Sequence, residues 1–466
     1  MRKIALIMDG WKRCFTYAWP AGILQKIRET QEDINLYIFN SSGDWSLDKD
    51  YSVGEYNIYH LPDLNDFDGI ILDLNNVRYE EVRNHIVEEA KKTKKPVISV
   101  AIELEDFYYV GIDNYAAMQK MIEHLHHQHG CKKFWFVMGP KENYENQMRT
   151  QALQDYVKEQ NLDYSDNDVY YENYEYHCGV SGFRSLYQLH DGKMPDAIVC
   201  ANDNIAVGVC EAAAKEGYYA PKDFCVTGFD DFDKAAYYIP RISTVSHVRE
   251  DVGYKCVEIF LDLWKGKDVK RFNYTETTPV FSESCGCEFH VAMEQRQHGR
   301  EQIMYDIETT DFEEQILSLE YELMRSRSIK EMTNWIPKCV PSMNCDAMYV
   351  VIDDHIKDFR KQLDYYDRHL IEDEEFHIAG YPEKMTVEFA YENGKHIEVE
   401  GQQICSLFPT FDYEKGGTDF LFMPLHFRNR TVGYFVIRNA VYLMEKQFLF
   451  KVLNTLASAM ENLHKT

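Results

Sequence analysis

The chain has 466 residues, of which 45% are hydrophobic and 27% charged, and this length exceeds what one hydrophobic core usually serves. The 77 acidic residues outnumber the 50 Lys and Arg residues, which gives a net charge of −27. Such a charge repels phosphate and argues against direct nucleic-acid binding by this chain. The densest basic run, over residues 91–95, is typical of a solvated helix end.

Three features of the sequence indicate the cellular compartment. The N-terminus runs directly into a strand-like apolar segment without the long apolar region of a secretory signal. The sequence contains no run of about eighteen apolar residues, the length that a membrane-spanning helix requires. The 12 cysteines are scattered, and several fall in predicted strands or helix faces, where thiols behave as small hydrophobes. We therefore predict a cytoplasmic, reduced protein with no membrane partner.

Strands and helices alternate along the first part of the chain. Apolar runs predict strands over 3–8, 34–39, 67–72 and 96–100. Helical periodicity predicts helices over 21–28 and 79–92. This alternation is typical of an α/β domain with a mostly parallel sheet.

A second lobe is expected to begin near residues 110–114. Asp113 or Asn114 is suited to cap a helix that runs to about residue 127. Further helices are predicted over 146–157, with Arg149 in the first turn, and over 181–189, with a strand over 134–137 between them and the first helix.

Residues 197–231 read as one complete βαβ unit. An apolar strand ends at Asn202-Asp203, a helix follows, and a second buried strand ends at Asp230-Asp231. In open α/β sheets, ligands bind beyond the carboxyl ends of the strands, where these polar residues stand.

Three sequence blocks of this region resemble a known family. They are A-N-D-x-x-A-x-G from residue 201, G-x-x-x-P-x-D-F-x-V-x-G-F-D-D from residue 217, and P-R-I-S-T-V from residue 240. Together they resemble the effector-binding domain of the lactose- and galactose-repressor family. The resemblance implies a two-lobed fold of the periplasmic-binding-protein type over residues 1–287.

The same resemblance implies effector contacts at seven positions: Arg149, Asn202, Asp230, His247, Tyr174, Trp11 and Tyr17. An amide, a carboxylate and a guanidinium supply the donors and acceptors that sugar hydroxyls or a ligand carboxylate need. Structural alternatives stay open, because Asp230 could cap a turn, Asn202 could cap a helix, and the aromatic residues could simply pack. Asp203 is expected to be structural.

Two groups of potential metal ligands do not predict a metal site by themselves. The four histidines between residues 124 and 129 lie at a predicted helix end on more than one face, and the pair His124 and His127 lacks a third ligand. Cys285 and Cys287 are separated by one residue, which is awkward for a tetrahedral site without two further ligands. We predict neither a metal nor a cofactor.

Enzyme signatures are missing from the sequence. No G-x-S-x-G, Walker loop or H-E-x-x-H is present. The run G-G-T-D-F at 416–420 superficially resembles a nucleotide-cyclase signature, but it stands in a turn before a strand, without the rest of that domain. We therefore predict that the chain is not an enzyme.

Composition changes after residue 287. Residues 288–330 contain no proline and one glycine, and apolar residues recur in steps of three and four, which predicts an amphipathic linker helix or helix pair that packs on a second copy in a homodimer. Strands are then predicted over 347–352, 385–390, 420–425 and 431–437, before a helix over 445–464. This part resembles a GAF domain, so the predicted domains are 1–287, 288–331 and 332–466.

The function implied is that of a sensor. Lactose-repressor relatives begin with a helix-turn-helix segment, whereas this sequence begins at the first strand of the sensor. The order of sensor, helical linker and GAF-like domain resembles bacterial sensors attached to diguanylate cyclase or AraC-type output modules. We expect a small-molecule effector, with a sugar as the first candidate, and an output module absent from this chain. The alternatives are an enzyme that uses cleft carboxylates and a stand-alone transport-type binding protein.

Overall fold

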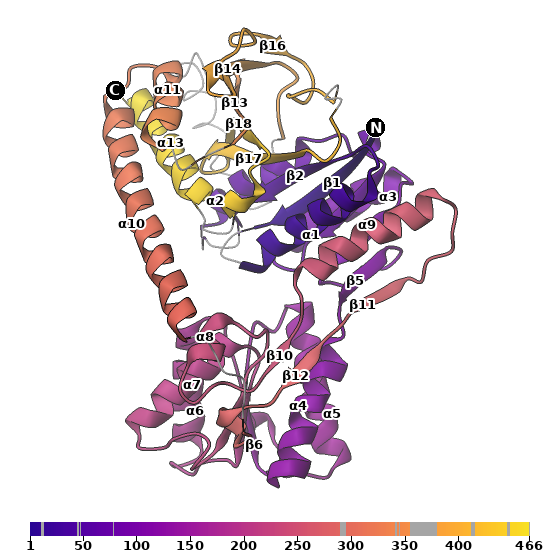
Figure 1. Ribbon diagram of the computed structural model, residues 1–466, viewed down its shortest axis with the longest axis vertical. Coiled ribbons are helices and arrows are strands. Elements are labelled where there is room, and N and C mark those ends of the chain that lie inside the picture. Colours follow the sequence, from indigo (N-terminus) through magenta and orange to yellow (C-terminus); the bar gives the residue numbers. More distant parts are fainter. Residues whose placement is uncertain are drawn as a thin grey trace, which may run out of the picture.

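The computed structural model describes residues 1–10, 14–43, 46, 48–77, 79–288, 295–340, 343, 345–354, 380–411, 415–444 and 448–465. These residues form an upper body that contains both the first and the last strands of the chain, and a lower lobe built from the middle of the chain (Figure 1). A long helix, α10 (Gln295–Arg325), runs beside both of them (Figure 1).

The first lobe is a parallel sheet with strand order β11-β5-β4-β3-β1-β2. Helices α1 and α9 pack together on one face, and α2 and α3 contribute to the core on the other face. The elements of this lobe are β1 (Arg2–Asp9), α1 (Cys14–Thr30), β2 (Ile34–Ser41), α2 (Lys49–Tyr56), η2 (Asn57–His60), η3 (Leu64–Asp66), β3 (Gly69–Asp73), α3 (Glu80–Lys92), β4 (Val97–Val100), β5 (Tyr108–Ile112), α9 (Glu250–Trp264) and β11 (Phe272–Thr275).

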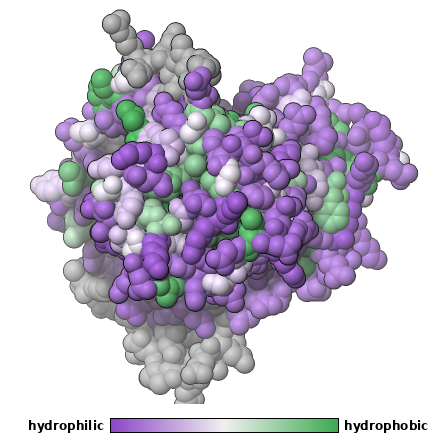
Figure 2. All heavy atoms as spheres, turned by 90° about the horizontal axis from the view of Figure 1, so that it is seen from below, coloured by the Kyte–Doolittle hydropathy of each residue, from purple (hydrophilic) through white to green (hydrophobic). Residues whose placement is uncertain are grey.

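The second lobe is a separate parallel sheet with strand order β7-β6-β8-β9 and its own hydrophobic core. Its elements are α4 (Asn114–His129), β6 (Phe134–Met138), α5 (Tyr144–Glu159), η4 (Asp166–Asp168), β7 (Val169–Tyr171), α6 (Tyr176–Leu189), β8 (Ala197–Cys200), α7 (Asp203–Lys215), β9 (Cys225–Thr227) and α8 (Asp233–Tyr237). Figure 2, which views the molecule from this end, shows a mostly hydrophilic surface with scattered apolar side chains.

The chain passes between the lobes at three places. It leaves the first lobe after β5, returns before α9, and leaves again between β11 and β12 (Thr278–Val280). Strand β12 pairs antiparallel with β10 (Thr244–Ser246), so two of the crossings are joined in a small ribbon. Connections of this kind, with few residues between two independent cores, permit hinge motion.

The C-terminal strands continue the sheet of the first lobe. Strand β17 (Asp419–Phe427) lies parallel beside β2, and the combined sheet has 12 strands. The remaining elements are α11 (Ile329–Cys339), β13 (Ala347–Asp353), β14 (Met385–Glu392), β15 (Lys395–His396), β16 (Gln403–Ile404), β18 (Arg430–Arg438), η7 (Val441–Met444) and α13 (Phe448–Lys465).

Side-chain alternation explains why β2 can lie inside so wide a sheet. All eight residues of β2 are buried. Tyr37 and Phe39 point to one face and stack on Phe420 and Phe422 of β17, with ring centroids 5.0 and 4.9 Å apart. Leu36 and Ile38 belong to the core of the opposite face. Because successive side chains of a strand alternate between faces, a strand that is apolar on both faces fits the interior of a sheet.

The predicted two-lobed α/β architecture is confirmed. The predicted helix over 21–28 is longer, because α1 begins at Cys14 and includes Pro20. The division at residues 287 and 331 stays a prediction, and the sheet runs without a break from the first lobe into the C-terminal strands. Among the described helices, none combines the length and apolar composition that crossing a bilayer requires.

Candidate effector-binding site

Five of the seven predicted contact residues lie near the carboxyl ends of the second-lobe strands, in two contacting groups. Arg149, Asp230 and His247 form one group, and Asn202 and Tyr174 form the other. Asn202 follows β8, Asp230 follows β9, and Arg149 lies on α5 beside them. The fold therefore brings together side chains that are distant in the sequence, such as Arg149 and Asp230, which are 81 residues apart.

The Arg149 guanidinium is buried and uses all of its nitrogens. Its Nε donates to Asn114 Oδ1 at 2.7 Å, and its Nη1 donates to the carbonyl of Ala201 at 2.7 Å. Its Nη2 lies 3.4 Å from Asp230 Oδ1, and its planar group lies over the Phe229 ring, 3.7 Å from the ring centroid. Burial is the largest single effect and disfavours the charged form, but Asp230, Glu145 and Tyr174 together outweigh it, so the pKa of Arg149 is raised.

Asp230 is held in a strained backbone conformation. Its φ is +95°, a region that residues with a side chain rarely adopt. Its N–H donates to the Val245 carbonyl at 3.1 Å, and its own carbonyl accepts from Arg249 Nη2 at 2.9 Å. Strain of this kind persists where surrounding contacts enforce it, and it is concentrated at functional sites.

Neighbouring groups keep the Asp230 carboxylate ionised although it is buried. Burial alone would raise its pKa, but Arg149, then His247, hold the pKa below its ordinary value. His247 Nε2 lies 3.9 Å from Asp230 Oδ1. The site thus presents one buried carboxylate balanced by cationic and imidazole neighbours.

Asn202 and Tyr174 line the same strand ends. Asn202 Oδ1 accepts from the Ile205 N–H at 3.0 Å and caps α7, and its Nδ2 donates to the Tyr174 carbonyl at 3.0 Å. The Tyr174 hydroxyl donates to Asn143 Oδ1 at 2.8 Å. The Tyr174 ring packs against Gly139, where a Cβ atom would come within 2.5 Å of it. The capping role that the sequence left open for Asn202 is therefore real.

Asp203 has the structural role that was expected. It is fully buried, and its Oδ2 accepts from the Phe232 N–H at 2.8 Å. Burial raises its pKa well above the ordinary value. This carboxyl group fixes the loop after β9, on which Asp230 stands.

A chain of hydrogen bonds connects this site with the first lobe. Asn114, which accepts from Arg149, donates through Nδ2 to Glu145 Oε1 at 3.4 Å. Glu145 Oε2 accepts from Asn75 Nδ2 at 3.3 Å, and Asn75 follows β3 of the first lobe. The sequence did not single out Asn75, Asn114 or Glu145 as contacts, although Asn75 and Asn114 each follow a strand end, as Asn202 does.

Of the two predicted first-lobe contacts, the structure describes Tyr17 alone. Tyr17 lies on α1, half-buried, and packs against the core shared by the first lobe and the C-terminal helices. Trp11 lies outside the described residues. Their part in ligand contact stays a prediction.

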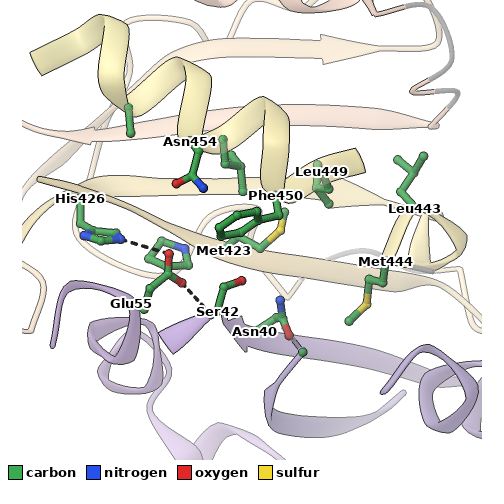
Figure 3. Close-up of a pocket in the computed structure, with 14 residues that line it drawn as sticks. Asn40, Ser42, Glu55, Met423, His426, Leu443, Met444, Leu449, Phe450 and Asn454 are labelled. Carbon is green, nitrogen blue, oxygen red and sulfur yellow. Dashed lines mark hydrogen bonds and ion pairs between the residues drawn. The ribbon is translucent and has the colours of Figure 1, made fainter. Parts of the chain in front are cut away.

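A cavity lies elsewhere, between the first lobe and the C-terminal elements (Figure 3). Glu55 is buried beside it, and its carboxylate accepts from the Ser42 N–H at 2.7 Å and lies 3.1 Å from His426 Nε2. Apolar side chains form much of its lining: Met423, Leu443, Met444, Leu449, Phe450 and Leu453. It depends on the pairing of β2 with β17, which no sequence pattern specified.

Two α/β lobes, joined by three crossings and with polar residues at the strand ends, define a two-lobed ligand-binding domain. In agreement, the family model for a periplasmic binding protein-like domain matches residues 122–285. The chain thus contains a periplasmic binding protein-like domain, and this region is similar in sequence to transcriptional repressors.

Curated relatives are transcriptional repressors. The ribose operon repressor of Haemophilus influenzae is 27% identical over 156 residues, which cover 34% of this chain and 45% of the repressor. The HTH-type transcriptional repressor PurR of Vibrio vulnificus is 24% identical over 245 residues, which cover 51% of this chain and 68% of that protein. The chain spans about half the length of the ribose operon repressor and of several other curated relatives that it matches.

Solved structures agree on the fold. A regulatory protein of the LacI family from Chloroflexus aggregans superposes with a TM-score of 0.51 at 20% identity, over 62% of this chain and 99% of that chain. The lac repressor dimer bound to operator and the anti-inducer ONPF superposes with a TM-score of 0.50 at 17% identity, over 61% and 81%. At these identities the similarity concerns the fold alone.

Proposed function

We propose that the chain is a cytoplasmic sensor whose two lobes close around a small molecule, with no bond made or broken. The observation that carries this proposal is the hydrogen-bond chain from Asp230 and Arg149 through Asn114 and Glu145 to Asn75 of the first lobe. A ligand that exchanges hydrogen bonds with this chain changes the relative stability of the open and closed arrangements.

A neutral polyol such as a sugar is the effector class we favour. The site offers the Asp230 carboxylate in contact with the Arg149 guanidinium, and the Asn202 amide next to Ala201, whose carbonyl accepts from Arg149. These groups together satisfy hydroxyls that both donate and accept. A relative named for the ribose operon supports the choice of a sugar. Because Arg149 is already paired with Asp230, an anionic ligand would have to compete with that carboxylate.

Signal transfer is proposed to run through α10. Near its beginning, the His298 ring stacks on Tyr237 of the second lobe, and farther along, Phe312 stacks on Phe448 of α13. The helix thus touches both the second lobe and the C-terminal part. We keep the proposals that residues 332–466 are a GAF-like relay and that an output module, a diguanylate cyclase or transcriptional regulator, acts downstream.

We also propose a homodimer formed along α10. Seven large apolar residues of this helix are exposed: Ile303, Met304, Tyr305, Ile307, Leu317, Tyr321 and Met324. A second copy of the helix would cover them. Light scattering after size exclusion should show a dimer for the wild type and a monomer for I303E/I307E. A wild-type monomer at micromolar concentration would contradict this proposal.

The effector site is tested by a thermal-shift screen of monosaccharides and disaccharides. A hit should raise the melting temperature of the wild type, and Asp230→Asn and Arg149→Met should weaken its binding by about 1.5–3 kcal/mol, which is tenfold or more in Kd. Asp191→Asn and Arg184→Met are matched controls, because both residues are exposed on the second lobe. These two controls should leave the shift unchanged.

Two results would count against the proposal. If the shift of every hit survives both Asp230→Asn and Arg149→Met, the site assignment is wrong. If a hit is chemically converted during incubation, as followed by mass spectrometry, the enzyme alternative gains over the sensor. The transport alternative has less support, since the relatives that match are transcriptional repressors.

A further inference from the structure

We propose that His124, His129, Cys285 and Cys287 bind one Zn²⁺ ion tetrahedrally and thereby fasten the end of the sensor domain to helix α4. This site is independent of the effector site and of the proposed sensing function. The spacing in the sequence does not join the two pairs, because His129 and Cys287 are 158 residues apart in the chain. The fold brings the four side chains together.

The distances between the four ligand atoms suit a tetrahedral site. All four atoms lie within 4.8 Å of one another. His124 Nε2 and His129 Nε2 are 3.1 Å apart, and Cys287 Sγ lies 3.3 Å from the first and 3.4 Å from the second. Cys285 Sγ lies 3.7 Å from His124 Nε2. With Zn–N of about 2.0–2.1 Å and Zn–S of about 2.3 Å, tetrahedral edges are about 3.3–3.8 Å.

Local backbone geometry explains how neighbouring residues share one centre. His129 is the last residue of α4, and Gly130 follows with φ +67° as the cap. Between the cysteines, Gly286 has φ +92°, which turns the chain so that both thiols face the histidines. Because this conformation favours glycine, the C-G-C pattern provides the two-ligand turn that the spacing alone made awkward.

Neighbouring groups hold the ligands in place. The His124 ring lies flat on Phe281, with ring centroids 3.5 Å apart and an interplanar angle of 7°. Cys285 is fully buried. The N–H groups of Cys285 and Cys287 both donate to the Ser282 carbonyl at 3.2 Å, which fixes the backbone that carries the two thiols. Orientation by surrounding groups is typical of metal ligands.

The ligand set selects the metal. Two imidazoles and two thiolates form a Cys₂His₂ site, the set that is typical of structural zinc, and two thiolates neutralise the ion. Four protein ligands leave no open position for catalysis. The thiols are not in disulfides among the described cysteines. A structural role therefore fits better than a catalytic one.

The location of the site indicates what the metal would do. Two ligands belong to α4 of the second lobe, and the other two lie at the end of η5 (Glu283–Cys285) and just after it, in the segment that precedes α10. Zinc would therefore fix this segment to the second lobe.

The experiment measures zinc in the purified full chain. Elemental analysis after dialysis against a weak chelator should find one Zn²⁺ per chain. Replacing zinc with Co²⁺ should give the strong visible bands and thiolate charge-transfer absorption of tetrahedral cobalt. Mutation of groups that merely orient metal ligands weakens metal binding roughly 10–100-fold. Cys287→Ser and His129→Asn remove a ligand itself, so they should weaken metal binding by at least as much.

Matched controls are available in the same chain. Cys405→Ser and His127→Asn alter exposed residues outside the cluster and should retain the metal. A strong chelator should lower the melting temperature of the wild type and of both controls, but not that of the two ligand variants. If a ligand variant fails to fold, cobalt titration of the chelated wild type decides the question alone.

Three outcomes would overturn the proposal. They are a wild-type zinc content no higher than that of Cys287→Ser, an octahedral cobalt spectrum, and a Cys285–Cys287 disulfide in protein purified under reducing conditions. The last result would mean that the cysteines form a bond with each other instead of binding metal.

Discussion

The two lobes are attached to the rest of the molecule in contrasting ways. The first lobe shares a continuous sheet with the C-terminal strands, and stacked aromatic rings cover the seam between β2 and β17. The second lobe has its own sheet and core, and it reaches the first lobe through crossing segments and polar contacts such as Asn75 with Glu145.

This difference separates a fixed body from a movable part. Stacked rings at a strand pair bury large apolar areas that are lost if the strands part, so the seam resists separation. A hydrogen bond between lobes exchanges with water at a net cost of only about 0.5–1.5 kcal/mol. We therefore expect the first lobe and the C-terminal part to move together, and the second lobe to move against them.

The strongest test of the fixed body is Phe422→Ala. Phe422 is fully buried at the seam and stacks on Phe39. Its truncation should lower the free energy of unfolding by about 3–5 kcal/mol, because a cavity replaces the ring. Urea denaturation measures this loss. Phe272→Ala, at an exposed position on β11, should cost far less. Equal losses would show that the seam is not a major source of stability.

A comparable loss is expected in the second lobe from Asp230→Asn. Removing the charge leaves the buried Arg149 guanidinium without its partner, which should cost about 3 kcal/mol at pH 7. Because the folded pKa of Asp230 lies below its ordinary value, its stabilising effect is present above about pH 4 and is lost as the pH falls through the folded value. In urea denaturation, the free energy of unfolding of Asp230→Asn should approach that of the wild type as the pH falls. The control Asp191→Asn should have the wild-type free energy of unfolding at every pH.

The seam should also show a pH dependence of opposite sign. Burial raises the pKa of Asp419, at the start of β17, to about 6. The stability that its protonated form contributes is present below about pH 4 and is lost as the pH rises through 6, a change of up to roughly 3 kcal/mol. The free energy of unfolding of Asp419→Asn, measured by urea titration, should therefore rise relative to that of the wild type between about pH 4 and 7. A constant difference between the two proteins would contradict this, and exposed Asp33→Asn is the control.

The smallest effect on stability is expected for Asn75→Ala. Loss of its bond to Glu145 should cost about 1 kcal/mol or less, yet it should shift the lobes towards an open arrangement. Small-angle scattering should show a larger radius of gyration than for the wild type or for Asn167→Ala, an exposed control. An unchanged radius would mean that this bond does not hold the lobes together.

Much of the two-lobed domain could be predicted from the sequence, because local patterns specify it. Strand ends followed by Asn202 and Asp230 are visible as apolar runs that stop at polar residues. The pairing of β2 with β17 could not be predicted. An apolar strand such as β2, which is buried throughout, is expected inside a sheet, but its sequence does not say which strand lies beside it. The proximity of His129 to Cys287 depends on tertiary folding and is equally invisible in the spacing.

Helix α10 has 31 residues, which corresponds to a rod about 46 Å long. A rod of this kind neither stretches nor shortens, so a rotation at its beginning must tilt it or slide it along its far end. If it slides, the Phe312 ring must leave its stack on Phe448, and a step of one helical turn, about 5.4 Å, would bring the next turn of the helix to the same place. Such a ratchet would convert a graded rotation into an all-or-none displacement.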